Sequence, residues 1–320
     1  MTDQPVIRVP AESPLVDVLG GCLRHEVRVH EQGFVALIDA MPRLVPVGQT
    51  ADFAIAQAAR VSYGLGTKKR TEDRGLIRYL LRHRHTTPFE MLEFKFHVSM
   101  PIFIARQWIR HRTANVNEYS GRYSVIPDHF YRPTLDAVRK QSAANRQGGD
   151  ETFAVPGTPA ASGSGADPSR AASPPGDESR TAQEFLDYLA RAEALYSEYE
   201  SLLSRGVSRE LARIGLPISA YTQWYWKCDL HNVLRFLSLR MDKHAQVEIR
   251  EYADAMYALI EPIVPVTMQA WRDYEFEGVH LSRLEVEALR ASARGGGAEL
   301  NTDNKREQAE WAAKRSALGL

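Results

Sequence analysis

The sequence predicts an α+β fold, a mostly antiparallel sheet flanked by long helices, and two observations lead to it. From Leu92 to Val98 apolar side chains alternate with polar ones, which is the period-two pattern of a half-buried strand. Apolar residues at helical spacing dominate the C-terminal half of the chain. Residues 1–50 mix short apolar runs with prolines and are interpreted as strands and loops. We expect one domain over residues 1–320.

The composition excludes several classes of protein. With 44% hydrophobic and 25% charged residues the chain is typical of globular proteins, and its 40 basic residues balance 40 acidic ones. A nucleic-acid coat or membrane-surface protein would carry a basic excess, so any anion site must be local. Without a signal peptide or a run of ~18 apolar residues, we expect a cytoplasmic protein with no membrane partner. Cys22 and Cys228 form no CxxC pair, so we expect free thiols and no metal site.

Apolar spacing predicts helices along most of the chain. They cover residues 51–62, 72–83, 101–111, 185–204, 209–216, 230–240 and 244–261, with a solvated helix and tail beyond Gly278. Ser208 and Asp229 can cap the helices that follow them. Thr86 or Thr87, with Glu90, fits a capping box around Pro88, which is a purely structural explanation of that segment.

Three other segments are not helical in pattern. A short strand is predicted at 122–126, and the aromatic run 221–226 is interpreted as a core cluster. Residues 150–181 are dominated by Gly, Ser, Ala and Pro, which cannot bury enough apolar surface to offset chain entropy. We interpret this last segment as a disordered surface insertion.

The stretch Pro101–Ser124 concentrates positive charge, because it holds four arginines and one glutamate in a chain of zero net charge. Arg106 and Arg110 lie one helical turn apart, and like charges at that spacing repel unless an anion sits between them. A solvated helix face followed by a polar loop is the alternative.

The string RHRTANVNEYSGRYS at 110–124 resembles the RHRxxSxNxxSxR signature of flavin-dependent thymidylate synthases, with Asn115 at the family's usual serine position. Other segments resemble the family in its own order over about residues 50–280. They are ARVS at 59–62, HTTPFE at 85–90, PIFIARQWIRHR at 101–112, RELARIGLP at 209–217 and LSLRMDKHAQ at 237–246.

This resemblance implies an enzyme that methylates 2′-deoxyuridine 5′-monophosphate (dUMP) to thymidylate. Its carbon donor would be methylenetetrahydrofolate, its hydride source FAD reduced by NADPH, and its assembly a homotetramer with active sites between subunits. The flavin contacts implied are Ser62, Thr87, Glu90, Arg110, His111, Arg112, Thr113, Asn117, Glu118, Asp229, His231 and Arg235. The nucleotide contacts implied are Arg106, Gln107, Trp108, Ile109, Arg110, Glu118, Tyr119, Ser120, Gly121, Arg122, Arg213 and Arg240.

Arg240 is the expected catalytic residue, because a guanidinium beside uracil N3 and O4 would stabilise negative charge that develops on the ring. The chain departs from the family at Asp229 and His231, where an Asn-x-Arg pair is usual. Two rival functions remain at this point. Cys228 could act as the nucleophile of the unrelated cysteine-dependent synthase, although no base lies beside it in sequence. The arginines could instead bind single-stranded nucleic acid, with Trp and Tyr stacking on bases.

Overall fold

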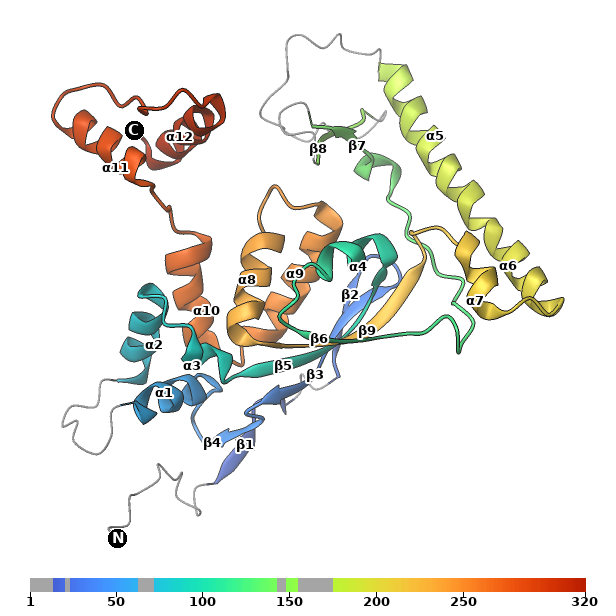
Figure 1. Cartoon of the computed structure of the whole chain (residues 1–320), viewed down its shortest axis with the longest axis horizontal. Coiled ribbons are helices and arrows are strands. Elements are labelled where there is room, and N and C mark those ends of the chain that lie inside the picture. Colours follow the sequence, from blue (N-terminus) through green and yellow to red (C-terminus); the bar gives the residue numbers. More distant parts are fainter. Residues whose placement is uncertain (1–13, 21–23, 63–71, 143–147, 155–174) are drawn as a thin grey trace. The chain divides into compact units, whose positions relative to one another are not determined.

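The computed structural model describes residues 14–20, 24–62, 72–142, 148–154 and 175–320. The chain forms two compact units, Met1–Met268 and Gln269–Leu320. In the first unit, helices pack against an antiparallel sheet (Figure 1). This arrangement confirms the predicted α+β class.

The main sheet has five strands in the order β2-β3-β5-β9-β6, and every neighbouring pair is antiparallel. The strands are β2 Glu26–Val29, β3 Gly33–Met41, β5 Glu93–Pro101, β9 Tyr221–Asp229 and β6 Asn115–Glu118. β5 and β9 pair along their whole length, from Glu93 opposite Asp229 to Pro101 opposite Tyr221. Two-stranded ribbons add β1 Leu15–Asp17 with β4 Leu44–Pro46, and β7 Arg139–Gln141 with β8 Gly149–Thr152.

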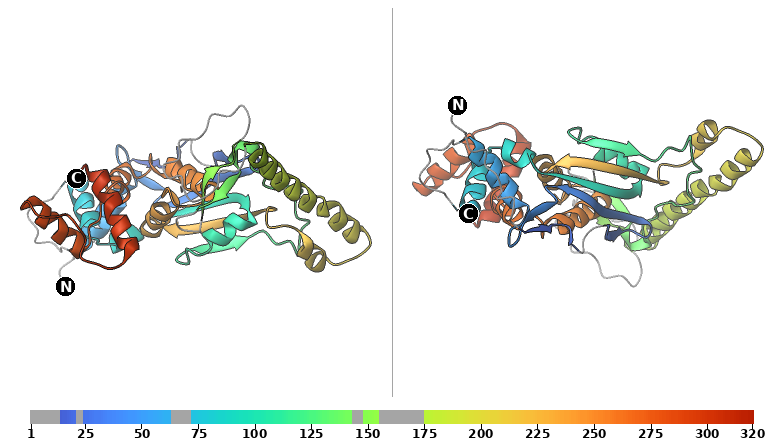
Figure 2. Two further views of the ribbon diagram at one scale, coloured as in Figure 1. Left: turned by 90° about the horizontal axis from the view of Figure 1, so that it is seen from above. Right: turned by 90° about the horizontal axis from the view of Figure 1, so that it is seen from below.

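Three helices pack on one face of this sheet: α4 Ile102–Trp108, α8 Leu230–Arg240 and α9 Val247–Ile260 (Figures 1 and 2). An aromatic core joins them, in which the Trp108 ring stacks on Phe236 at 4.5 Å and meets Trp226 edge-on at 5.6 Å. All three rings are essentially inaccessible to solvent. Because α4 directly follows β5 and α8 directly follows β9, the sheet fixes where both helices begin.

The remaining helices belong to both units. In the first unit they are α1 Asp52–Val61, α2 Asp73–Arg82, α3 Thr87–Glu90, α5 Pro175–Glu193, α6 Leu195–Ser204 and α7 Arg209–Ala212, followed by the 3₁₀ turn Arg213–Gly215. α10 Pro265–Trp271 crosses the boundary between units, and the second unit continues with α11 Arg283–Ala293 and α12 Lys305–Leu318. Ser282 and Glu285 form a reciprocal capping box at the start of α11.

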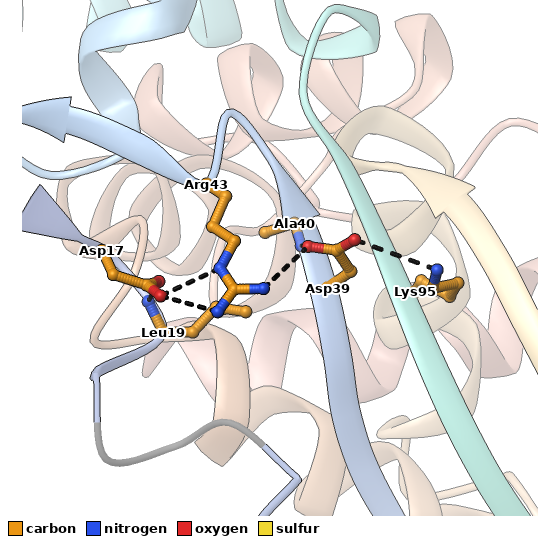
Figure 3. A network of polar contacts seen from close by, with 6 residues as sticks. All are labelled: Asp17, Leu19, Asp39, Ala40, Arg43 and Lys95. Carbon is orange, nitrogen blue, oxygen red and sulfur yellow. Dashed lines mark hydrogen bonds and ion pairs between the residues drawn. The ribbon is translucent and has the colours of Figure 1, made fainter.

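A series of ion pairs and hydrogen bonds connects the β1–β4 ribbon to the main sheet (Figure 3). Arg43 donates from Nε to Asp17 Oδ2 at 2.9 Å, and its Nη1 lies 4.0 Å from Asp39 Oδ1. Lys95 Nζ on β5 completes the series 3.8 Å from Asp39 Oδ2. These groups are solvent-accessible, so they orient the ribbon more than they stabilise it.

Most predicted elements are confirmed. The alternating segment forms β5, the patterns at 51–62 and 72–83 form α1 and α2, and the buried stripe at 230–240 forms α8. Asp229 caps α8 as predicted, because its carboxylate accepts a hydrogen bond from Asn232 N at 2.9 Å.

Two predictions near the arginine stretch are wrong. No strand forms at 122–126, because Tyr123 N and Ser124 N both donate to Ser120 O at 3.1 Å and close a turn there. The strand is instead β6, which joins the sheet through β9. The aromatic run 221–226 is not simply a cluster but the first part of β9, with Trp224 and Trp226 buried and Tyr225 exposed.

Helix ends account for the other differences. Thr86 lies at the N-cap of α3 without a side-chain capping bond, and Ser208 likewise at α7, so neither predicted cap forms. The helix predicted at 185–204 is two helices, interrupted at Ala194. The predicted insertion is ordered at both edges, where residues 150–152 belong to β8 and 175–181 to α5, and residues 155–174 lie outside the described residues.

Candidate active site

Arg240, His111 and Gln107 meet where α4 and α8 end, and we call them the Arg240 cluster. Arg240 is the last residue of α8, Gln107 lies in the last turn of α4, and His111 follows that helix. Arg240 Nε donates to His111 Nε2 at 3.1 Å, and its Nη2 donates to the Gln107 carbonyl at 3.2 Å. Both contacts fix the guanidinium of a half-buried residue at a defined place.

The electrostatics of the cluster favour a neutral histidine. Burial, followed by the nearby charges of Arg240 and Arg235, lowers the pKa of His111 to about 4. Burial and the charge of Arg110 also lower the pKa of Arg240, although an arginine stays protonated at neutral pH. At neutral pH His111 therefore offers an unprotonated nitrogen to a charged arginine.

Five of the predicted arginines are exposed and have no partner among the described residues. In the described part of the chain no hydrogen bond or ion pair holds the guanidinium groups of Arg106, Arg110, Arg112, Arg213 and Arg235. Such groups bind phosphates through forked, charge-assisted hydrogen bonds. These five arginines are therefore candidate ligands for an anion.

The loop at 118–122 forms a second group of predicted residues. Glu118 Oε1 accepts from Thr222 Oγ1 at 2.7 Å, and the Arg122 amide donates to Ser120 Oγ at 3.3 Å. Arg122 Nε lies 3.3 Å from Glu210 Oε2 on α7. Gly121 is buried against Ile126 and the Arg213 side chain, so the loop and the segment after α7 lie in contact.

The third group lies at the other end of α8. α3, which carries Thr87 and Glu90, packs against α1 and α8, and α1 ends at Ser62. The Asp229 carboxylate is engaged with the Asn232 backbone and side-chain amides at 2.8–3.1 Å. A rise of 1.5 Å per residue places the two ends of α8 about 15 Å apart. The structure therefore brings Gln107, His111 and Arg240 together but leaves this group at a distance.

The remaining predicted residues differ in how far their side chains are available to a ligand. The Trp108 ring is buried in the aromatic core, so only its backbone is available to a ligand. Ile109, Asn117 and Tyr119 are exposed, and Tyr119 donates its hydroxyl to Val125 O at 2.7 Å. Thr113 uses its carbonyl to accept from the Cys228 thiol at 3.2 Å.

Two contacts of the site were not predicted. Gln107 donates its side-chain amide to Gln246, and Thr222 orients Glu118. The segment with Gln246 was noted in the sequence, but nothing local pairs it with Gln107. Gln246 also lines a cavity of 720 Å³ between α4, α5 and the segment 243–248, where the buried Ser219 hydroxyl makes no hydrogen bond to the described residues.

The structure weakens both rival functions. Cys228 is 3% exposed, and burial, with the charges of Asp229 and Glu93, raises the pKa of its thiol, so a nucleophilic thiolate is disfavoured. For the nucleic-acid rival, Trp108, Trp224 and Trp226 are buried and cannot stack on bases, which leaves only exposed tyrosines such as Tyr123 and Tyr225 for that role. Among the described residues, no helix is both long and apolar enough to cross a membrane, and no three His, Cys, Asp or Glu side chains gather as metal ligands.

Comparison with known proteins assigns the family. Residues 43–266 match the family model described as thymidylate synthase complementing protein. A flavin-dependent thymidylate synthase from Dictyostelium discoideum is 59% identical over 97% of this chain and 93% of its own length. One from Wolbachia pipientis wMel is 45% identical over 88% of both chains.

A solved structure agrees with this assignment. The UMP/dUMP methylase PolB from Streptomyces cacaoi, bound with 5-Br UMP, is 30% identical, with a TM-score of 0.58 over 78% of this chain and 97% of PolB. The match to the family model covers most of the first unit, including the Arg240 cluster and the loop at 118–122. The chain therefore belongs to the flavin-dependent thymidylate synthase family.

Proposed function

We propose that the protein makes thymidylate by reductive methylation of dUMP, with the Arg240 cluster at the reacting base. The observation that carries this proposal is the Arg240 guanidinium, held by His111 and Gln107 among exposed arginines. Family membership supplies the reaction, in which methylenetetrahydrofolate provides the carbon and NADPH the reducing equivalents. PolB, a UMP/dUMP methylase holding a brominated UMP, supports a uridine nucleotide as substrate.

The donors on this chain suit FAD. Its diphosphate requires guanidinium or amide N–H groups, and Arg110, Arg112 and Arg235 are exposed with no partner among the described residues. When bound, FAD supplies the hydride chemistry that no protein side chain can provide. We assign its binding to the predicted flavin contacts other than His111, whose imidazole is engaged by Arg240. Because Asp229 is engaged in capping α8, the neighbouring half-buried His231 is the freer hydrogen-bonding group there.

The loop at 118–122 and the segment after α7 suit the nucleotide phosphate. Arg213 is free among the described residues, while Arg122 has only a solvent-exposed ion pair with Glu210, which a dianionic phosphate can replace. Ser120 adds a hydroxyl, and Glu118 is oriented by Thr222. Among the described residues no histidine, lysine or carboxylate is hydrogen-bonded to Ser120, so we assign it to binding and not to nucleophilic attack.

Arg240 would act as a fixed cation. Of its five N–H donors, one is used by His111 and one by the Gln107 carbonyl, which leaves three for a ligand. A guanidinium at uracil N3 and O4 stabilises the negative charge of the activated ring without itself transferring a proton. The half-buried position strengthens this interaction, because fewer water molecules screen it.

We also propose that each active site is built from several subunits of a cytoplasmic homotetramer. On one chain the predicted flavin contacts at α1, α3 and the start of α8 lie about 15 Å from the Arg240 cluster, measured along α8. Contributions from a second copy would complete a site that one chain leaves divided. Sedimentation of the FAD-loaded protein tests the tetramer.

The decisive experiment replaces Arg240. Arg240→Ala should lower the rate of thymidylate formation by about 100- to 1,000-fold, the usual cost of removing a stabilising donor, while the visible flavin absorbance per protomer stays within about twofold. Arg290→Ala, which removes an exposed arginine on α11, is the matched control and should change neither quantity. Equal loss of flavin and turnover in Arg240→Ala would contradict the assignment.

A further inference from the structure

We infer that His111 is a positioning residue for Arg240, acting as the hydrogen-bond acceptor that fixes the plane of its guanidinium. The inference rests on the proposed role of Arg240. In the chain itself, Arg240 Nε lies 3.1 Å from His111 Nε2.

The direction of this hydrogen bond is unambiguous. Arg240 carries only N–H donors, so His111 Nε2 must be the acceptor, and the imidazole proton must sit on Nδ1. A doubly protonated ring would offer no acceptor and would repel the guanidinium. Arg110, Arg235 and Arg240 are the charged groups that act on this pair, and all are cations that favour the neutral ring.

The imidazole is itself held by the core. The His111 ring meets Phe236 edge-on at 5.0 Å, and Phe236 stacks on the buried Trp108 at 4.5 Å. The His111 amide donates to the Trp108 carbonyl at 2.9 Å. The acceptor nitrogen is therefore fixed relative to the sheet before any ligand binds.

The second contact of Arg240 makes the positioning specific. Its Nη2 donates to the Gln107 carbonyl, one of the last carbonyls of α4, which have no partner further along the helix. Two acceptors bound to two different nitrogens of a planar guanidinium, Nε and Nη2, determine its plane, whereas one acceptor would leave it free to rotate. The three remaining donors then point in directions set by the fold, as efficient electrostatic stabilisation requires.

Two substitutions at position 111 test this role in the FAD-loaded protein. His111→Ala should lower the rate of thymidylate formation by about 10- to 100-fold, with the KM for dUMP and the flavin content each changed by less than about threefold. His111→Gln retains an acceptor oxygen and should recover most of that rate. A purely structural role would not predict rescue by a residue of different shape, so failure of Gln to rescue would overturn the inference.

A double-mutant cycle separates this inference from the proposed function. If His111 acts through Arg240, His111→Ala combined with Arg240→Ala should be no slower than Arg240→Ala alone. Multiplicative effects, or a rate loss in His111→Ala that follows loss of flavin, would show that His111 acts independently and would overturn the inference. A fully active Arg240→Ala would instead refute the proposed function.

Discussion

Gly121→Ala tests whether the loop at 118–122 and Arg213 form one nucleotide site. A Cβ at position 121 would lie 3.0 Å from Ile126 Cδ1 and 3.1 Å from Arg213 Cδ, closer than the ~3.5 Å at which carbon atoms attract. Ile126 cannot retreat easily, because its amide donates to Tyr199 at 3.1 Å and its carbonyl accepts from Tyr196 at 2.8 Å. Arg213 is exposed, so its flexible side chain should move instead.

The expected effect falls on binding more than on stability. A hydrogen bond to a charged group contributes about 1.5–3 kcal/mol, so partial displacement of Arg213 from the phosphate should cost about 1 kcal/mol, or a roughly fivefold weaker Kd for dUMP. Stability should fall by less than about 1 kcal/mol, since only side-chain ends must shift. Calorimetric titration of the FAD-loaded protein with dUMP, together with urea unfolding, measures both.

The chain offers a matched control at Gly215, two residues beyond Arg213. A Cβ there has no heavy atom within 4 Å, so Gly215→Ala should leave the Kd for dUMP unchanged. If Gly121→Ala bound dUMP as tightly as the wild type, or if both alanine variants weakened binding equally, the proposed contact between Arg213 and the phosphate would be refuted.

Two further predictions concern stability. The buried Asp52 accepts hydrogen bonds from Val266 N at 2.9 Å, Thr267 N at 3.0 Å and the Thr267 hydroxyl at 2.5 Å, so Asp52→Ala should lower the unfolding free energy by about 3–5 kcal/mol in urea. Glu72→Ala, an exposed N-cap without a capping bond, should change it by less than about 0.5 kcal/mol, and equal losses would contradict this reasoning. Burial, opposed by Glu248, lowers the pKa of His30 below its usual 6.5. The unfolded chain therefore takes up a proton that the folded chain does not, and the unfolding free energy should decrease as pH falls below about 6.5. His30→Asn suits the positive φ of 56° and should flatten this slope, and an unchanged slope would exclude His30 as its source.

The sequence predicted local elements better than it predicted the pairing of strands. Period-two alternation identified β5, and the capping residue Asp229 located the start of α8, because both signals are local. β6 was missed because all four of its residues are exposed and it carries no apolar alternation, so its pairing with β9 alone makes it a strand. In β9 the buried Trp224, Trp226 and Cys228 do alternate, but the dense aromatic run obscured that period.

Within the candidate site, the signature predicts which residues bind ligands but not how they are arranged. Nothing in the sequence indicates that Arg240 contacts His111, since these residues are 129 positions apart. Likewise, the burial of Trp108 follows from the packing of α4 against α8 and the sheet, although its neighbours Gln107 and Ile109 reach the surface. Contacts of this kind depend on the tertiary fold, which local patterns do not specify.

The antiparallel pairing of β5 with β9 bears on the mutual repulsion of the arginines in the protein without a bound ligand. The two strands end at opposite ends of the pair, yet the helices that continue from them finish at the same place, where Arg240 reaches the Gln107 carbonyl. The C-terminal end of a helix carries partial negative charge, which stabilises a nearby cation by about 0.3–1 kcal/mol. Two such ends facing one group of guanidiniums offset part of their mutual repulsion. The positive surface can therefore be prepared in the folded protein, without a bound anion to hold it together.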